Sequence, residues 1–351
     1  MHPILNQYFE LIKKFLPTKK EGISIGLDIG AGECKLVEIS KSDSTFELKN
    51  FAIQPIKGSD IGAGVQSVLA TLTEECTSVY SSVSGKGTLI RYIEMPKMSL
   101  DELRNSFAIE SDKYFPFAQD QIYTDCYIVE DNKKGKEMSV MAAAAKKDII
   151  DQRLKALSDI GIKVDFIGIN PIALANALNV LGVPAEPQAG HAYAVLDMGE
   201  AISNLQIFID RVPRFTRDIF IGGRDFTKSI SNALGVDLQQ AEKIKKELPQ
   251  NHEKISNSFE SAILNIVQEL RLSFDYFNNE KNCELVKLYL TGGTSMLHGL
   301  KESLEKKLDI KVELWNPLMS LRIADDLNKS AVEANAMKLG VALGLALYQY
   351  D

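Results

Sequence analysis

A hairpin pattern that occurs twice constrains the fold of this chain more than any other feature of its sequence. The first copy, GISIGLDIGAGECKLVEIS over residues 22–40, alternates apolar with small residues, turns at Gly30-Ala31-Gly32 and continues as a second apolar run. Such alternation predicts two paired strands with one buried face. The second copy, YAVLDMGEA over residues 193–201 and NLQIFI over residues 204–209, repeats strand, D-x-G turn and strand. Two copies predict a duplicated domain whose halves face each other across a cleft.

The first turn carries groups suited to a phosphate chain. Asp28 stands just before the glycines and Lys35 just after them, and the glycines leave backbone amides uncovered. A carboxylate, an ammonium and bare amides can together hold a phosphate chain and its Mg²⁺. A D-x-G-x-G turn also occurs in many ordinary hairpins, so a single copy favours a structural turn. The repeat moves the interpretation toward a phosphate site.

A third glycine turn follows a predicted buried strand at Lys287–Leu290. The sequence there continues as Thr291-Gly292-Gly293-Thr294 and then as a predicted helix over residues 298–308. Backbone amides at the N-terminus of a helix attract anions, so this turn is a candidate nucleotide contact. An ordinary strand-to-helix turn is the alternative interpretation.

Length and charge exclude several classes of protein. A chain of 351 residues is too long for one simple core and suits two domains. The net charge of −7 argues against a nucleic-acid binder. The sequence contains no run of about 18 apolar residues, so it predicts no membrane span. The four cysteines and four histidines are too scattered for a metal site.

The sequence predicts four parts. Residues 1–21 form an amphipathic helix that packs on protein or lies on a membrane surface. Residues 22–190 form domain I, interrupted by an inserted α+β module at residues 88–162 in which Ser99 and Glu102 open a helix as a capping box. Residues 191–332 form domain II. Residues 333–351 belong to a C-terminal helix, predicted from residue 332 to 348, whose small residues let it return to domain I.

The chain carries a D-x-G hairpin, an inserted module, a second D-x-G hairpin, a T-G-G turn and a closing helix of small residues. This ordered set resembles the superfamily of actin, Hsp70 and the sugar kinases. The resemblance implies an α/β, two-domain actin-like ATPase fold with ribonuclease H-like duplicated halves. The inserted module is similar to the 1C (SHS2) subdomain of FtsA-type proteins. The closest likeness is to the PilM family, and it is carried by LDIGAGECKLVEI (27–39), KYFPFAQDQIYTDCYIV (113–129), LDMGEAISNLQIF (196–208), ELRLSFDYF (269–277) and LTGGTSMLHGL (290–300).

The PilM resemblance implies a cytoplasmic scaffold, peripheral at the inner membrane, that serves type IV pilus or type II secretion assembly. By that likeness it grips the N-terminal cytoplasmic peptide of a PilN-like membrane protein in a groove between subdomains 1A and 1C, and contacts other platform proteins. Nucleic acid is not expected as a partner. Residues 1–20 are a possible peripheral contact with the membrane.

The resemblance also implies ATP and Mg²⁺ as cofactors. Asp28 and Asp197 would hold Mg²⁺ through water, Lys35 would offset charge on the β-phosphate, and Glu242 and Lys245 would lie near ribose and base. The full set of implied cofactor-binding residues is Asp28, Gly30, Ala31, Gly32, Glu33, Lys35, Asp197, Gly199, Glu200, Ala201, Glu242, Lys245, Gly292, Gly293 and Thr294.

Two positions depart from the superfamily pattern. Ala31 stands where many relatives have a hydroxyl, and Asn170 stands where a carboxylate or glutamine usually orients the attacking water. An amide can orient water but is no base. The sequence therefore predicts ATP binding with slow or absent hydrolysis, with Asn170 as the water-orienting residue.

Two alternatives stay open on the same fold. A small-molecule kinase would need a carboxylate base at the first crossing between the two domains, where Asn170 stands. A polymerising actin homologue or FtsA relative is the other; FtsA carries a C-terminal membrane helix, for which residues 348–351 leave no room. The PilM resemblance supplies no counterpart for the helix predicted before Gly22.

Overall fold

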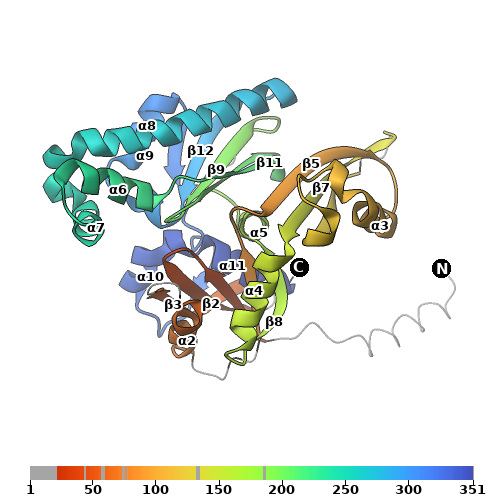
Figure 1. Cartoon of the computed structure of the whole chain (residues 1–351), viewed down its shortest axis with the longest axis horizontal. Helices are drawn as coiled ribbons and strands as arrows, with labels where there is room; N and C mark the ends of the chain where they lie inside the picture. Colours follow the sequence, from red (N-terminus) through yellow and green to blue (C-terminus); the bar gives the residue numbers. More distant parts are fainter. Residues whose placement is uncertain are drawn as a thin grey trace.

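The computed structural model describes residues 22–350, apart from 43–44, 57–59, 73–75, 77, 132–134 and 185–186. The helix predicted over residues 1–21 lies outside these described residues. Figure 1 shows two halves, one above the other, with a smaller lobe that contains β5, β7 and α3 beside them. The predicted α/β actin-like fold is confirmed, because each half is built on a mixed sheet of the same topology.

The first sheet begins with the first D-x-G hairpin. Across the sheet lie β14 (Arg322–Ile323), β3 (Thr45–Pro55), β2 (Glu33–Ser42), β1 (Ser24–Ile29), β4 (Ser78–Val83) and β8 (Lys163–Ile169). Strands β1, β2 and β3 are an antiparallel meander, and β4 and β8 run parallel to β1. The ends of β1, β4 and β8 therefore meet at one carboxyl edge, which is where open α/β sheets bind their ligands.

The second sheet repeats this order. Across it lie β11 (Val212–Ile219), β10 (Ser203–Ile209), β9 (Ala192–Met198), β12 (Leu285–Thr291) and β13 (Lys311–Leu314). Here too a three-stranded meander is followed by two parallel strands. Asp28 pairs across its hairpin with Lys35, and Asp197 occupies the same place opposite Asn204. The two hairpins are therefore equivalent parts of a duplicated unit.

Helices cover the two sheets and fill the connections. They are α2 (Ile61–Leu69), α4 (Lys147–Ser158), α5 (Asn170–Leu181), α6 (Gly223–Leu234), α7 (Leu238–Lys246), α8 (Leu248–Lys281), α9 (Leu300–Leu308), α10 (Lys329–Asn335) and α11 (Gly340–Leu347). Helix α8 lies along one face of the second sheet (Figure 1). Its side chains at Phe259, Ile263, Ile266 and Leu270 enter the core at helical spacing.

The inserted module has a sheet of its own, in the order β5 (Thr88–Pro96), β7 (Glu137–Lys146) and β6 (Ile122–Glu130). Helix α3 (Leu100–Glu110) begins at the predicted capping box and buries Leu103 and Phe107 against this sheet. Helix α4 follows β7 directly, but Leu157 packs into the core beneath β1 and β2. Residues 147–158, predicted as part of the module, thus cover the first sheet and join the module to it.

The closing segment packs on the first half through glycine contacts. A Cβ atom on Gly344 would lie 1.7 Å from the carbonyl oxygen of Ala173 in α5, and one on Gly26 would lie 2.0 Å from that of Ala342. Only glycine permits such close approach between backbones. Helix α11 is therefore buried between β1 and α5.

The single helix predicted over residues 332–348 is wrong. The chain instead forms α10, a 3₁₀ turn at Ala336–Lys338 and α11, with a bend of 90° between the two helical segments. The carbonyl oxygen of Met337 accepts hydrogen bonds from the backbone nitrogen of Gly292 (2.8 Å) and the hydroxyl of Thr291 (3.0 Å). These tertiary bonds occupy a carbonyl that a continuous helix would use, so the helix breaks there.

In the described part of the chain, no single helix is long and apolar enough to cross a membrane. The bent pair α10 and α11 reaches that length and composition when the two are counted together.

Candidate functional site

A cavity of about 1100 Å³ lies between the two halves. It has the size of a pocket that holds a small organic ligand. The carboxyl ends of β1, β8, β9 and β12 lead into it. Every residue of the set expected from the sequence lines it, namely Asp28, Gly30, Ala31, Gly32, Glu33, Lys35, Asn170, Asp197, Gly199, Glu200, Ala201, Glu242, Lys245, Gly292, Gly293 and Thr294.

The tips of the two D-x-G hairpins touch each other at the cavity. A Cβ atom on Gly32 would lie 1.5 Å from Oε2 of Glu200, so the second tip rests directly on the backbone of the first. Arg224 holds the same Glu200 side chain at 2.9 Å. A larger residue at position 32 would displace Glu200. The two tips therefore form one continuous lining, as the duplicated pattern predicts.

The T-G-G turn is attached to the second tip. The hydroxyl of Thr294 donates to the carbonyl of Gly199 at 2.8 Å, and a Cβ atom on Gly292 would lie 2.4 Å from Oδ1 of Asp197. The turn does not lead straight into the predicted helix: it forms a short 3₁₀ helix at Gly293–Met296, and α9 begins only at Leu300. Its backbone lines the cavity, but not as the N-terminus of an α-helix.

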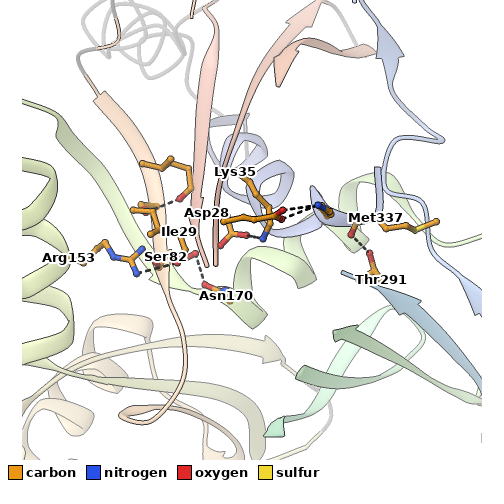
Figure 2. A network of polar contacts seen from close by, with 12 residues as sticks. Asp28, Ile29, Lys35, Ser82, Arg153, Asn170, Thr291 and Met337 are labelled. Carbon is orange, nitrogen blue, oxygen red and sulfur yellow. Dashed lines mark hydrogen bonds and ion pairs between the residues drawn. The ribbon is translucent and has the colours of Figure 1, made fainter. Parts of the chain in front are cut away.

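Three charged side chains, Asp28, Lys35 and Asp197, interact with one another at the two hairpin tips. Lys35 Nζ lies 2.8 Å from Oδ2 of Asp28, whose residue is only 3% exposed (Figure 2). Burial lowers the pKa of Lys35, but the charge of Asp28 and its hydrogen bond outweigh burial and raise that pKa overall. Burial also raises the pKa of Asp197 to about 6, with Lys35 opposing and Asp28 adding to the effect. The two carboxylates thus share one ammonium.

The pKa of Asp197 gives a testable pH dependence. The folded protein binds this proton more tightly than the unfolded chain, whose aspartate titrates near 3.8. The stability that this proton supplies is present below pH 3.8 and is lost as the pH rises through about 6. Asp197→Asn cannot ionise, so we expect it to exceed the unsubstituted protein in stability at pH 7 by up to about 3 kcal/mol, with little difference at pH 4. Urea unfolding at both pH values measures this; equal stability at pH 7 would contradict it.

The donor set fits Mg²⁺ bound together with phosphate. Among the residues that the structure describes, no three side chains of His, Cys, Asp or Glu converge on one metal position. Mg²⁺ is commonly held by one or two carboxylates, with phosphate oxygens and water as its other ligands. Asp28 and Asp197 supply the carboxylates that such a site needs, and the rest would have to come from the nucleotide.

Glu242 and Lys245 lie at the other end of the cavity, on α7. Lys245 Nζ contacts the Glu242 carboxylate (2.6 Å), the carbonyl of Gly223 (3.0 Å) and the hydroxyl of Thr227 (2.9 Å). Burial raises the pKa of Glu242, but hydrogen bonds from Lys245 and Thr227 lower it further than burial raises it. Lys245 therefore holds an ionised Glu242 in place at the start of α6.

The contacts at and around the site include three residues that the sequence did not indicate. Lys338, from the bend of the closing segment, pairs with both carboxylate oxygens of Glu33 at 3.0 and 3.1 Å. Ser82 donates its hydroxyl to Oδ1 of Asn170 at 2.8 Å, and Arg153 donates to the carbonyl of Ser82 at 3.0 Å (Figure 2). None of these belongs to a motif, because each meets its partner only through the fold.

Comparison with known proteins assigns the chain to a family. The family model for type IV pilus assembly protein PilM matches residues 26–350. The chain belongs to the PilM family. The solved structure of the PilM-PilN type IV pilus biogenesis complex is similar to it, with a TM-score of 0.83 and 25% identity over 95% of this chain and 100% of that chain. The resemblance seen in the sequence is thereby confirmed, and the chain is an actin-like type IV pilus assembly protein.

Two further relatives place this PilM-family protein in the wider fold. The ethanolamine utilization protein EutJ from Carboxydothermus hydrogenoformans has a TM-score of 0.55 and 13% identity over 96% of this chain and 97% of that chain, which shows the fold alone. The cell division protein FtsA from Neisseria meningitidis serogroup B is 26% identical over 188 residues. That match covers 46% of this chain and 44% of FtsA, so the chain spans less than half the length of this relative.

Proposed function

We propose that this protein binds Mg²⁺–ATP between its two halves and acts as a nucleotide-dependent scaffold in type IV pilus assembly. The observation that carries the proposal is the meeting of both hairpin tips and the T-G-G turn around one cavity. The expected position at the cytoplasmic face of the inner membrane remains a prediction. A small-molecule kinase is the weaker proposal, since the crossing presents the amide of Asn170 and the family match is to pilus assembly.

The residues of the cavity suggest how ATP would be held. Backbone amides of Ala31 and Gly32 on the first tip and of Glu200 and Ala201 on the second would face the phosphates, because those of Gly30 and Gly199 donate to carbonyls within their own turns. Lys35 would offset the charge of the phosphates. Asp28 and Asp197 would hold Mg²⁺ through water. Mg²⁺ held there would supply positive charge that offsets the charge of the phosphates. The nucleotide would then act as a wedge that sets the distance between the halves.

Hydrolysis is expected to be slow or absent. Ala31 has no hydroxyl for the terminal phosphate, and the amide of Asn170 cannot accept a proton from water. We expect fewer than about one turnover per second, the lower edge of ordinary enzymes. Phosphate release by the purified protein with Mg²⁺ and ATP measures this, and faster turnover would contradict it.

The second part of the proposal is that the protein binds the N-terminal cytoplasmic peptide of a PilN-like membrane protein in the groove between domain I and the module. The similarity to the PilM-PilN complex over nearly the whole chain supports it. The module also touches the second half, because the Tyr92 hydroxyl lies 3.1 Å from that of Thr216 and Arg214 pairs with Glu130. A change in the distance between the halves would therefore move the module and alter the width of the groove.

A binding experiment tests both parts together. The protein is titrated with such a peptide in the presence of Mg²⁺–ATP and, separately, without nucleotide. We expect saturable binding that is stronger with ATP, and we expect Asp28→Ala to remove the gain from ATP. A scrambled peptide controls for charge. Peptide binding that Asp28→Ala leaves unaltered would remove the nucleotide from the mechanism while leaving the scaffold.

A further inference from the structure

One contact at the edge of the cavity is not explained by ATP binding alone. The hydroxyl of Ser82, near the end of β4, donates to Oδ1 of Asn170, the first residue of α5, at 2.8 Å. Ser82 is 1% exposed, whereas Asn170 is partly exposed and lines the cavity. A buried serine thus binds the oxygen end of the Asn170 amide (Figure 2).

We propose that Ser82 is a positioning residue that fixes Asn170 with its amide nitrogen toward the cavity, so that the site selects nucleotides carrying a terminal phosphate. This inference rests on the proposed binding of ATP. It assigns Asn170 the role of a hydrogen-bond donor to phosphate, where the sequence alone suggested a residue that orients water.

The orientation of the amide follows from its hydrogen-bond inventory. An asparagine side chain has one oxygen, which accepts, and one nitrogen, which donates twice. A buried hydroxyl has to donate to something, and Oδ1 of Asn170 is the acceptor that the described contacts give to Ser82. Nδ2 of Asn170 has no acceptor within the described parts of the chain. It is therefore the nitrogen that opens to the cavity.

The backbone of Ser82 is held in place by Arg153. The guanidinium of Arg153, on α4, donates to the carbonyl of Ser82 at 3.0 Å and to that of Ile29 at 3.4 Å. These carbonyls lie near the ends of the neighbouring strands β4 and β1, which lead into the cavity. Arg153 connects the two strand ends, which fixes the backbone position of Ser82. The Ser82 hydroxyl can therefore hold the Asn170 amide in one orientation.

The chemical consequence concerns the terminal phosphate. Asn170 shares the cavity with Asp28 and with Ala31, the residue proposed above to lie beside the terminal phosphate. An NH₂ group can donate a charge-assisted hydrogen bond to a phosphate oxygen, whereas an amide oxygen turned the same way would repel it. Fixing the amide therefore favours ATP over ADP. It also keeps the amide oxygen away from the water that hydrolysis would need.

The test compares affinities for ATP and ADP, measured with Mg²⁺ by calorimetry, in four proteins. They are the unsubstituted chain, Ser82→Ala, Asn170→Ala and the double variant. One charge-assisted hydrogen bond corresponds to about a tenfold change in affinity, so we expect Asn170→Ala to lower the ATP-to-ADP affinity ratio about tenfold. Ser82→Ala should lower it in the same direction. The double variant should match Asn170→Ala, because Ser82 acts only through Asn170.

Ser81→Ala is the matched control. Ser81 precedes Ser82 on β4, is fully buried, and donates its hydroxyl to the carbonyl of Leu27 at 2.9 Å. Its substitution removes a comparable buried hydrogen bond without touching Asn170, so the affinity ratio should stay as in the unsubstituted protein.

Three results would overturn the inference. They are a Ser82→Ala variant with an unchanged ratio, a ratio that Ser81→Ala lowers equally, and effects of Ser82→Ala and Asn170→Ala that simply add. Failure of the unsubstituted protein to bind either nucleotide would overturn the proposed function, and this inference with it.

Discussion

Gly344→Ala should destabilise the protein by at least about 3 kcal/mol, the upper range of the cost of an overpacked core. The reason is the packing of α11, where the new Cβ atom would lie 1.7 Å from the carbonyl oxygen of Ala173. That oxygen belongs to the backbone of α5 and cannot turn aside as a side chain can. One of the helices would have to move, and α11 would separate from β1 and α5.

A second glycine-to-alanine change provides the control. Gly62 lies in α2, and a Cβ atom there would meet nothing closer than 3.5 Å. Alanine favours a helix over glycine by up to about 1 kcal/mol, so Gly62→Ala should be neutral or stabilising. Urea unfolding of the two variants measures the difference. Similar stabilities for Gly344→Ala and Gly62→Ala would show that α11 is not packed as described.

Lys35→Met should destabilise the protein and also remove most of its affinity for ATP. The change leaves the buried carboxylate of Asp28, and the partly exposed carboxylate of Asp197 beside it, without the ammonium they share. Breaking a buried ion pair by removing one partner costs about 3–5 kcal/mol. The same ammonium is proposed to face the phosphates, so ATP should bind on the order of 10- to 100-fold more weakly.

The double variant Lys35→Met/Asp28→Asn separates these two effects. It removes both charges of the pair, so most of the lost stability should return. ATP binding should not return, because the lysine and one carboxylate that would hold Mg²⁺ are both missing. Thermal unfolding and calorimetry with Mg²⁺–ATP measure the two quantities. Recovery of ATP affinity together with stability would show that Lys35 acts only on folding.

The strands and the principal motifs could be predicted because their signals are local. Alternation of apolar residues located β1 and β9, and glycines at the turns located both hairpin tips. The motif positions then met in one cavity because the same local pattern, placed twice, is folded the same way twice. The chemistry assigned to those positions stays a prediction.

What the sequence missed depends on contacts between distant residues. The small residues of 332–348 are typical of one close-packed helix, and nothing local shows that Met337 gives its carbonyl to Thr291 and Gly292. Lys338 and Glu33 are 305 positions apart, and the lysine has no motif around it. Helix α4 was assigned to the module because it follows β7, although Leu157 completes the core of the first half.

The corner at Met337 has a mechanical consequence. Thr291 and Gly292 of the T-G-G turn, in the second half, both donate hydrogen bonds to the carbonyl of Met337. Three residues after Met337 the chain enters α11. That helix is locked against the first sheet at Gly26. The segment that joins the two halves here is short and held at both ends, so a rotation of one half would be transmitted directly to the other.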